Sequence, residues 1–301
     1  MRSDVLTHPV EADSAPGHTW LSDLIVLTKV RVNVLVVATT AGGYYLGSDG
    51  PVDLLRLLVV CAGTALVASG AAALNQVVER DTDRLMTRTQ TRPIARGGMT
   101  PARGRLIALA LAAAGLAAIW LGSNPAATAV ALLTFILYTL VYTPLKRRTS
   151  LATVVGAVPG ALPPMIGWAA SSTLAAPAPW TLFLVMFIWQ LPHVLAIAWM
   201  YRDQYAAAGL PMLPVIDTTG ATTGRQASLW AATLIPGSQL PFLFGISDRT
   251  YAIGALVLGM MQLALAVHFA LRRTNAHARL LFYASITYLP LLWVLMAAGK
   301  R

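Results

Sequence analysis

Three oxygen-bearing side chains recur every four residues where a long apolar run of the sequence ends. Asn75, Glu79 and Asp83 have this spacing, and the apolar residues 54–78 lead into them. On a helix, residues four apart lie on one face, one turn above the next. Carboxylate and carbonyl oxygens suit a hard cation such as Mg2+, which is commonly shared with substrate phosphates. The pattern predicts a metal site with Asn75, Glu79 and Asp83 as ligands and catalytic residues.

A set of cations follows these oxygen ligands. Arg84, Arg88 and Arg92 repeat at the same spacing, and Lys146 and Arg147 follow a later apolar run. Guanidinium groups bind phosphate oxygens in pairs, so these five residues are the predicted site for a diphosphate on a lipid tail. The arginines alone are as typical of a solvated loop beside a membrane span. The carboxylates fit that alternative less well, because polar groups at membrane depth are costly and usually functional.

Aromatic and polar residues in later apolar runs form a second candidate group. They are predicted to line a cavity for an organic substrate: Gln190, His193, Tyr138, Tyr142, Trp189 and Asp203. A single membrane histidine is also often a helix–helix hydrogen-bond partner, and tyrosines at the end of a span are common anchors. Residues 151–170 are interrupted by Gly and Pro, which indicates either close helix packing or a broken helix beside a cavity.

The composition places these groups in a membrane protein. The 301 residues are 56% hydrophobic and 11% charged, against about 25% charged in soluble proteins. No period-two alternation of an outer-membrane barrel is present. The predicted fold class is an all-α membrane protein of about nine transmembrane helices around a central cavity open to the cytoplasm and to lipid. The expected spans are 25–46, 54–78, 104–122, 126–143, 151–170, 180–200, 227–246, 251–271 and 279–298.

The distribution of charge predicts the orientation. A net charge of +10 would suggest nucleic acid for a soluble protein, but here the cations lie at the ends of apolar runs, so no nucleic-acid partner is expected. With a cytoplasmic N-terminus, all but four of the 22 Lys and Arg residues lie inside. This predicts an inner (plasma) membrane protein with its C-terminus outside. Residues 1–20 are predicted to be a disordered cytoplasmic tail, and residues 21–301 a single membrane domain.

Several stretches together resemble the UbiA superfamily of intramembrane prenyltransferases, over about residues 25–290. The run NQVVERDTDRLMTRTQTRP, from Asn75, is similar to its NxxxDxxxD-type motif. GAVPGALPPMIGW, WQLPH at 189–193 and AGLPMLP at 208–214 resemble one branch, the protohaem IX farnesyltransferases (haem O synthases). Glu79 stands where Asp is usual. The second DxxxD pair of many members is absent, with Gln204 beside Asp203 where an acidic residue is common.

The resemblance implies an enzyme with Mg2+ as its cofactor. It would move a farnesyl group from farnesyl diphosphate to a vinyl group of haem b, with addition of water, giving haem O for terminal-oxidase assembly. Haem b would then be a substrate, membrane lipid would surround the site, and haem A synthase or the assembling oxidase would be a partner. Two alternatives stay open: a related enzyme acting on a quinone precursor or chlorophyllide, and a non-catalytic transporter. The oxygen ligands followed by arginines favour diphosphate chemistry over transport.

Overall fold

Helices make up almost all regular structure of the protein. The computed structural model describes residues 19–301. Within that range no strand forms, and Ser247 and Lys300 make an isolated bridge. The helices, with one π-helical segment η1, are α1 (Trp20–Thr28), α2 (Val30–Gly47), α3 (Leu54–Val78), α4 (Arg80–Asp83), α5 (Pro101–Gly122), α6 (Pro125–Ile136), η1 (Leu137–Tyr142), α7 (Thr143–Leu145), α8 (Ala152–Ala161), α9 (Pro163–Ser171), α10 (Ala178–Met200), α11 (Arg202–Ala207), α12 (Leu213–Ile216), α13 (Ala221–Leu243), α14 (Arg249–Arg272) and α15 (Asn275–Ala298). The all-α membrane prediction is confirmed.

The number of spans agrees approximately with the expected nine. In the described part of the chain, seven helices are long and apolar enough to cross a membrane, or eight if the bent pair α1 and α2 is one span. Two of the seven are composite, because α6, η1 and α7 run on as one, as do α8 and α9. Helix α13 is not among them. It is nonetheless a long helix, and it packs between α10 and α14.

Polar caps and prolines in the sequence set where these helices begin. The side chain of Thr100 accepts a hydrogen bond from the amide of Arg103, and Pro101 starts α5. Asn124 caps α6 in the same way, and Pro125 follows it. Such caps satisfy amides that have no partner within the helix, and proline is tolerated at the first helical position because its amide is not needed there.

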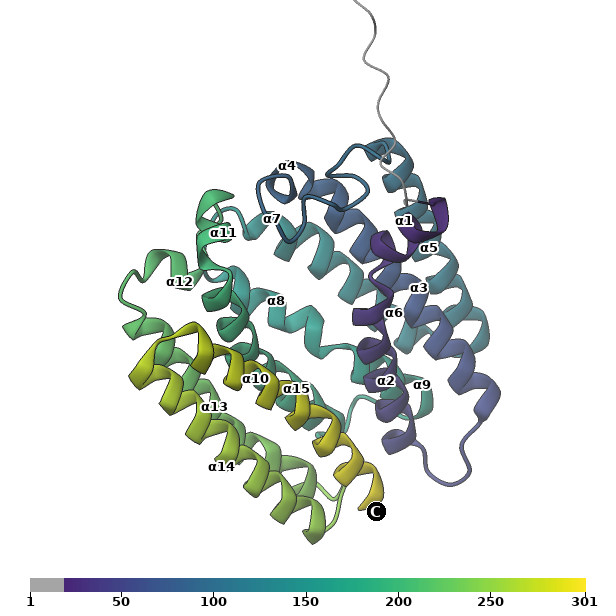
Figure 1. The fold of residues 1–301 in the computed structure, drawn as a ribbon. Helices are drawn as coiled ribbons and strands as arrows, with labels where there is room; N and C mark the ends of the chain where they lie inside the picture. Colours follow the sequence, from purple (N-terminus) through teal and green to yellow (C-terminus); the bar gives the residue numbers. More distant parts are fainter. Residues whose placement is uncertain (1–18) are drawn as a thin grey trace, which may run out of the picture.

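The helices form two groups, seen side by side in Figure 1. In one group, α3 packs against α5 and α2 packs against α9; in the other, α13 packs against α10 and α14, and α14 against α15. Small residues permit the close crossing of α3 and α5, where Gly63 and Gly115 each face the other's backbone. Helices α1, α4, α7, α11 and α12 lie toward one end, and the C-terminus lies at the other (Figure 1). The two long connections, 84–100 and 201–220, are therefore gathered at one end.

Helix α1 is fixed tightly to this end of the molecule. Arg96 donates to both carboxylate oxygens of Asp23 at 2.6 Å, and Gln76 donates to the carbonyls of Val26 and Leu27 at 2.9 Å. The predicted tail, 1–20, lies outside the described residues except for its last two, which begin α1. The hydrogen bonds of Arg96 and Gln76 hold the junction of α1 and α2 against the end of α3.

Candidate active site

Asn75, Glu79 and Asp83 keep their helical spacing although the helix is interrupted between them. Helix α3 ends at Val78 and α4 is a single turn. The amide of Glu79 still donates to the carbonyl of Asn75 at 2.9 Å, and that of Asp83 to the carbonyl of Glu79 at 2.8 Å. The three residues are 2%, 7% and 1% exposed. They form a buried row, unlike the charged residues of a solvated loop.

Each residue of this row contacts a cation from another part of the chain. The Lys29 ammonium donates to Asn75 Oδ1 at 3.0 Å, and Lys146 donates to Glu79 Oε1 at 2.7 Å. One guanidinium nitrogen of Arg92 lies 2.7 Å from Asp83 Oδ2 and 4.0 Å from Glu79 Oε2. The two carboxylates thus flank a single positive charge.

These contacts act on the two carboxyl groups in different ways. Burial by itself would raise the pKa of Glu79, but Lys146, together with Lys29 and Arg92, holds it below its ordinary value. Burial raises the pKa of Asp83 in spite of its hydrogen bonds from Arg92. The charge of Glu79 is therefore secured by its neighbours, and the charge of Asp83 depends on keeping a cation close.

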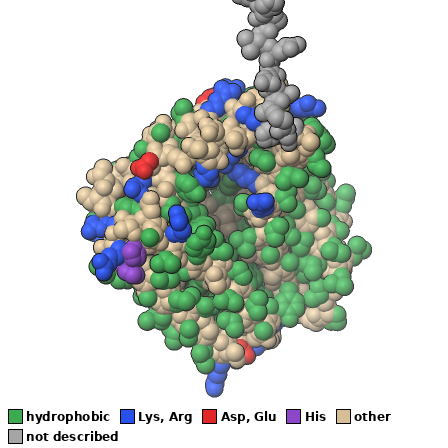
Figure 2. All heavy atoms as spheres, viewed as in Figure 1, with side chains coloured by type: hydrophobic (Ala, Val, Ile, Leu, Met, Phe, Trp, Pro, Cys, Tyr) green, Lys and Arg blue, Asp and Glu red, His purple; other side chains and the backbone are tan. Residues whose placement is uncertain are grey.

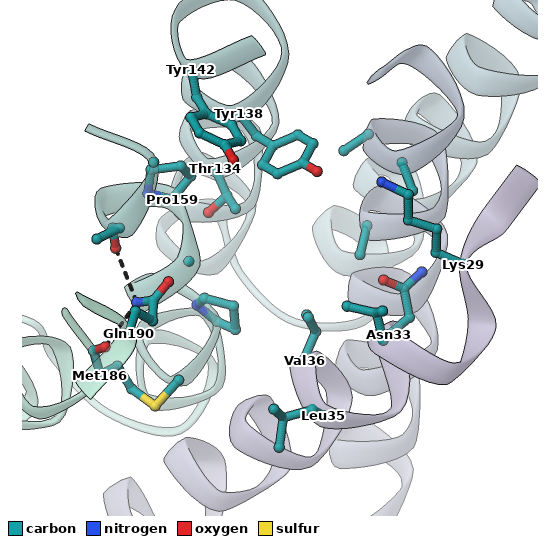
Figure 3. A pocket seen from close by; sticks show the side chains of 18 of the residues that line it. Lys29, Asn33, Leu35, Val36, Thr134, Tyr138, Tyr142, Pro159, Met186 and Gln190 are labelled. Carbon is teal, nitrogen blue, oxygen red and sulfur yellow. Dashed lines mark hydrogen bonds between the residues drawn. The ribbon is translucent and has the colours of Figure 1, made fainter. Parts of the chain in front are cut away.

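A cavity of about 340 Å3 lies beside this row. Tyr138, Tyr142 and Gln190 lie on one side of it, and Lys29 and Asn33 face them from the other (Figure 3). The face shown in Figure 2 is hollowed at its centre, with Lys and Arg side chains around the upper part of the rim and hydrophobic side chains around the rest. The volume falls at the lower end of the range typical of ligand pockets, about 300–1,000 Å3.

Two side chains connect the cavity to the buried row. Lys29 lines the cavity and bonds to Asn75. Tyr142 lines the cavity, and the Lys146 ammonium lies 5.3 Å from its ring centre. A ligand that fills the cavity at this end meets the Lys29 ammonium, with the side chain of Asn75 directly behind it.

A π-helical segment presents the two tyrosines. The backbone amide of Thr143 donates to the carbonyl of Tyr138, five residues back, as the wider turn of η1 requires. The hydroxyl of Thr143 donates to the same carbonyl at 2.7 Å. The rings of Tyr138 and Tyr142 are 5.4 Å apart, and both line the cavity. The faces of two electron-rich rings therefore border the space next to Lys146.

His193 has a defined hydrogen-bond partner that indicates its tautomer. Its Nδ1 lies 2.7 Å from the hydroxyl of Ser285, which itself donates to the carbonyl of Phe282 at 2.6 Å. With the serine proton directed at that carbonyl, we assign Nδ1 as the donor to Ser285, which leaves a lone pair on Nε2. The rings of Trp189 and Phe282 stack on the two sides of the imidazole, each with its centre 5.1 Å away. This holds the ring rigidly at the cavity wall.

Four of the predicted site residues lie apart from both the cavity lining and the buried row. Arg84 is half-exposed and donates to the carbonyl of Ala95, and Arg147 is exposed. Arg88 donates to the hydroxyl of Tyr205 at 3.3 Å and so joins the two long connections. Asp203 does not line the cavity, and this corrects the expectation for it: its side chain is 91% exposed.

These four side chains lie apart because they belong to the connections beyond the ends of the long helices. The i, i+4 repeat of the arginines does not continue as a helix, because α4 ends at Asp83 and turns follow. Of that repeat, Arg92 alone returns to the carboxylates. The structure brings together the oxygen ligands, Arg92 and Lys146, and places Trp189, Gln190 and His193 on the cavity wall.

Lys29 was not among the site residues predicted from the sequence. Its backbone is left-handed, with φ 49° and ψ 47°, where α1 meets α2 at a bend of 45°. This conformation costs a residue with a side chain about 1–2 kcal/mol, and such strain persists where surrounding contacts fix it. The signal in the sequence was a lysine inside an apolar run, which we interpreted only as a cytoplasmic charge.

Comparison with known proteins gives the family. The model of the UbiA prenyltransferase family matches residues 35–294. The chain belongs to this family. It is therefore a prenyltransferase, embedded in a membrane by several spans. A protein of Solibacter usitatus named protoheme IX farnesyltransferase is 43% identical over 93% of this chain and 99% of its own length. The protein of that name from Myxococcus xanthus is 41% identical over 96% and 97%.

Solved structures confirm the UbiA fold. A digeranylgeranylglyceryl phosphate synthase has a TM-score of 0.77 at 16% identity and covers 93% of this chain and 98% of its own. A UbiA homologue from Archaeoglobus fulgidus, bound to GPP and Mg2+, has a TM-score of 0.66 at 17% identity and covers 91% and 99%. The arrangement of the helices is thus shared by proteins of very different sequence.

One glycine of this family member leaves room for a cavity side chain. A Cβ at Gly160 would overlap the amide of Gln190, which donates to the carbonyls of Met186 at 2.8 Å and Ala157 at 3.2 Å (Figure 3). We expect Gly160→Ala to lower the unfolding free energy by about 1 kcal/mol or more for each hydrogen bond lost. Thermal unfolding in detergent measures this. The double variant with Gln190→Ala should recover most of the loss; no recovery would show that the glycine serves another contact.

Proposed function

We propose that the protein transfers a farnesyl group from farnesyl diphosphate to a vinyl group of haem b, with addition of water, to give haem O. The observation that carries the proposal is a single cavity with two different ends. At one end Lys29 lines the cavity and donates to Asn75, the first residue of the buried row, and the wall further along holds His193, whose Nε2 is left with a lone pair. The names of the relatives, which cover nearly the whole chain, support the same donor and acceptor.

The oxygen ligands fit a divalent cation. Their donor set is one amide and two carboxylate oxygens, and the carboxylates already flank one positive charge, the Arg92 guanidinium. Hard cations take such ligands, and Mg2+ usually completes its shell with phosphate oxygens and water. We assign Asn75, Glu79 and Asp83 as its ligands. When bound there, Mg2+ would neutralise charge that develops on a departing diphosphate.

Side chains of the protein would bind the departing diphosphate and stabilise the cation that it leaves behind. Arg92 and Lys146 are placed to hold phosphate oxygens through charge-assisted hydrogen bonds. The C1–O bond of the farnesyl diphosphate breaks with its electron pair on the diphosphate, which leaves an allylic cation. The ring faces of Tyr138 and Tyr142 border this space and stabilise that cation. The wall of broken helices, α8 and α9, excludes bulk water and accommodates the isoprenoid tail.

The acceptor completes the reaction. The π electrons of the vinyl group attack C1 of the farnesyl cation, which forms the new carbon–carbon bond. The positive charge passes to the carbon next to the porphyrin, where a water oxygen adds and loses a proton. We assign His193 Nε2 to the haem iron rather than to a propionate, because it carries a lone pair and no proton. That contact would orient the vinyl group toward the diphosphate end.

The experiment that tests this function is mass analysis of haem extracted from membranes that express the chain. We expect a species heavier than haem b by one farnesyl group and one hydroxyl group, because the water that adds loses a proton. Purified protein with Mg2+ and farnesyl diphosphate should form it from haem, and should not prenylate 4-hydroxybenzoate under the same conditions. Prenylation of the phenol alone would overturn the proposed acceptor.

The position of Asn75, Glu79 and Asp83 and of the surrounding cations supports the proposed orientation in the membrane. The oxygen ligands and the two long connections lie at the end where most cations gather, opposite the C-terminus (Figures 1 and 2). We therefore place this end at the cytoplasmic face of the inner membrane. A C-terminal fusion to a reporter that is active only outside the cytoplasm tests the assignment: we expect activity, and an inactive fusion would contradict the orientation.

A further inference from the structure

Each of the three proposed metal ligands is paired with a cation of the chain itself. Lys29 donates a hydrogen bond to the side-chain oxygen of Asn75, and Lys146 donates one to an oxygen of Glu79. Arg92 donates to both oxygens of Asp83, at 2.8 and 2.7 Å. The lone pairs that a metal ion would use are directed at these nitrogens. A metal ion and these three side chains therefore compete for the same oxygen atoms.

The three cations come from separate elements and converge on the row. Lys29 lies at the junction of α1 and α2, Lys146 directly follows α7, and Arg92 belongs to the connection after α4. Their side chains are largely shielded from solvent, with those of Arg92 and Lys146 only 15% and 18% exposed. Three buried charges from three elements are costly to assemble unless each meets an opposite charge or a polar oxygen. The convergence indicates a function for the cations as a set.

The net charge of the cluster limits what can bind to it alone. With all three cations protonated, they and the two carboxylates leave one positive charge. A divalent metal ion alone would add positive charge to a site that is already positive. A fully ionised diphosphate ester alone would leave an excess of negative charge beside the buried carboxylates. The metal ion and the diphosphate together bring the cluster to neutrality.

We infer that Lys29, Lys146 and Arg92 are exchangeable counter-ions, which pass from the oxygen ligands to the diphosphate when metal ion and diphosphate bind together. The inference rests on the proposed function and adds how the site is loaded: neither ligand binds well without the other. Lys29 is the cation best placed to make this exchange, because it faces both the cavity and Asn75.

Removal of one counter-ion should change the affinities for the two ligands in opposite directions. Lys29→Gly removes the ammonium, and glycine adopts the φ of 49° without strain. We expect this variant to bind Mn2+ alone more tightly than wild type does, and pyrophosphate more weakly. A residue that only binds phosphate would weaken pyrophosphate binding and leave Mn2+ binding unchanged. A residue that only supports the fold would weaken both.

The experiment measures free Mn2+ by electron paramagnetic resonance with purified full-length protein in detergent, with and without pyrophosphate. For wild type we expect pyrophosphate to increase Mn2+ affinity about tenfold or more, and Mn2+ to increase pyrophosphate affinity by the same factor, as linkage requires. Lys29→Gly should raise affinity for Mn2+ alone about fivefold or more. Because pyrophosphate also binds Mn2+ in solution, each variant is compared with wild type at equal concentrations.

Matched controls separate this effect from a general change in charge. Arg31→Gln and Arg148→Gln each remove an exposed cation close in sequence to Lys29 or Lys146, and both should bind as wild type does. Lys146→Gln is a second test variant that keeps the native backbone. It should shift both affinities in the same directions as Lys29→Gly, so the inference stays testable if one variant does not fold.

The outcomes distinguish this inference from the proposed function. If wild type forms haem O but binds Mn2+ equally well with and without pyrophosphate, the exchange of counter-ions is wrong and the function stands. An unchanged or lower affinity of both variants for Mn2+ alone also overturns the exchange. If no haem O forms and wild type binds no Mn2+ even with pyrophosphate, the proposed function itself fails.

Discussion

Glu79→Gln should reduce haem O formation about 100-fold or more, in the range reported for loss of one charge-stabilising group in an active site. The carboxylate is 7% exposed, lies 2.7 Å from Lys146 and keeps a depressed pKa, so it is charged at neutral pH. Glutamine keeps the shape and an oxygen but removes the charge that a metal ion needs. Haem O measured by mass analysis in membranes, normalised to inserted protein, gives the result.

The control for this prediction lies on the same turn of helix. Asp81 is between Glu79 and Asp83 in sequence, but its side chain is 62% exposed and pairs with Arg80. Asp81→Asn should leave haem O formation within about twofold, since exposed ion pairs contribute little. If Glu79→Gln retained the activity of the Asp81 variant, the assignment of Glu79 to the metal site would be wrong.

Glu79→Ala should have an additional effect on stability. Removing the carboxylate leaves the Lys146 ammonium without its partner in a site where it is 18% exposed. Loss of one partner of a buried ion pair typically costs about 3–5 kcal/mol. For this reason the glutamine variant, which keeps a hydrogen-bond acceptor, is the better probe of chemistry.

His193→Ala should weaken the use of haem and spare the prenyl diphosphate. The free Nε2 at the cavity wall is the group we assign to the haem iron, and the proposed site for diphosphate is formed by other residues. We expect the KM for haem to rise ~10–100-fold, as is typical when a group that orients a metal centre is lost. Visible spectra should show that bound haem has lost a nitrogen ligand. Added imidazole should restore part of the activity.

A second membrane histidine provides the control for His193. His268 lies on α14, exposed and beside the ring of His277, and outside the central cavity. His268→Ala should leave haem use unchanged. If His193→Ala weakened binding of haem and of pyrophosphate equally, the histidine would have a structural role, through Ser285 and the stacked rings of Trp189 and Phe282.

Much of the fold could be predicted because the membrane limits the choices. A span must satisfy its own backbone hydrogen bonds and stay apolar for about 20 residues, so apolar length and caps such as Thr100 and Asn124 locate helices directly. The sequence also predicted a span over 227–246, where α13 forms, although α13 is not among the seven helices long and apolar enough to cross a membrane. The helical spacing of Asn75, Glu79 and Asp83 could also be predicted from the sequence, because backbone hydrogen bonds between residues four apart maintain it.

The sequence by itself determined the helices, the row of Asn75, Glu79 and Asp83, and the resemblance that led to the family. Tertiary structure alone decided which cations meet that row: Lys29 and Lys146 reach it from 46 and 67 residues away, and Arg84 and Arg88 do not. Periodicity describes one helix at a time, whereas a salt bridge between distant elements depends on how those elements pack. Charges outside the helices follow the course of the connections, which no local pattern specifies.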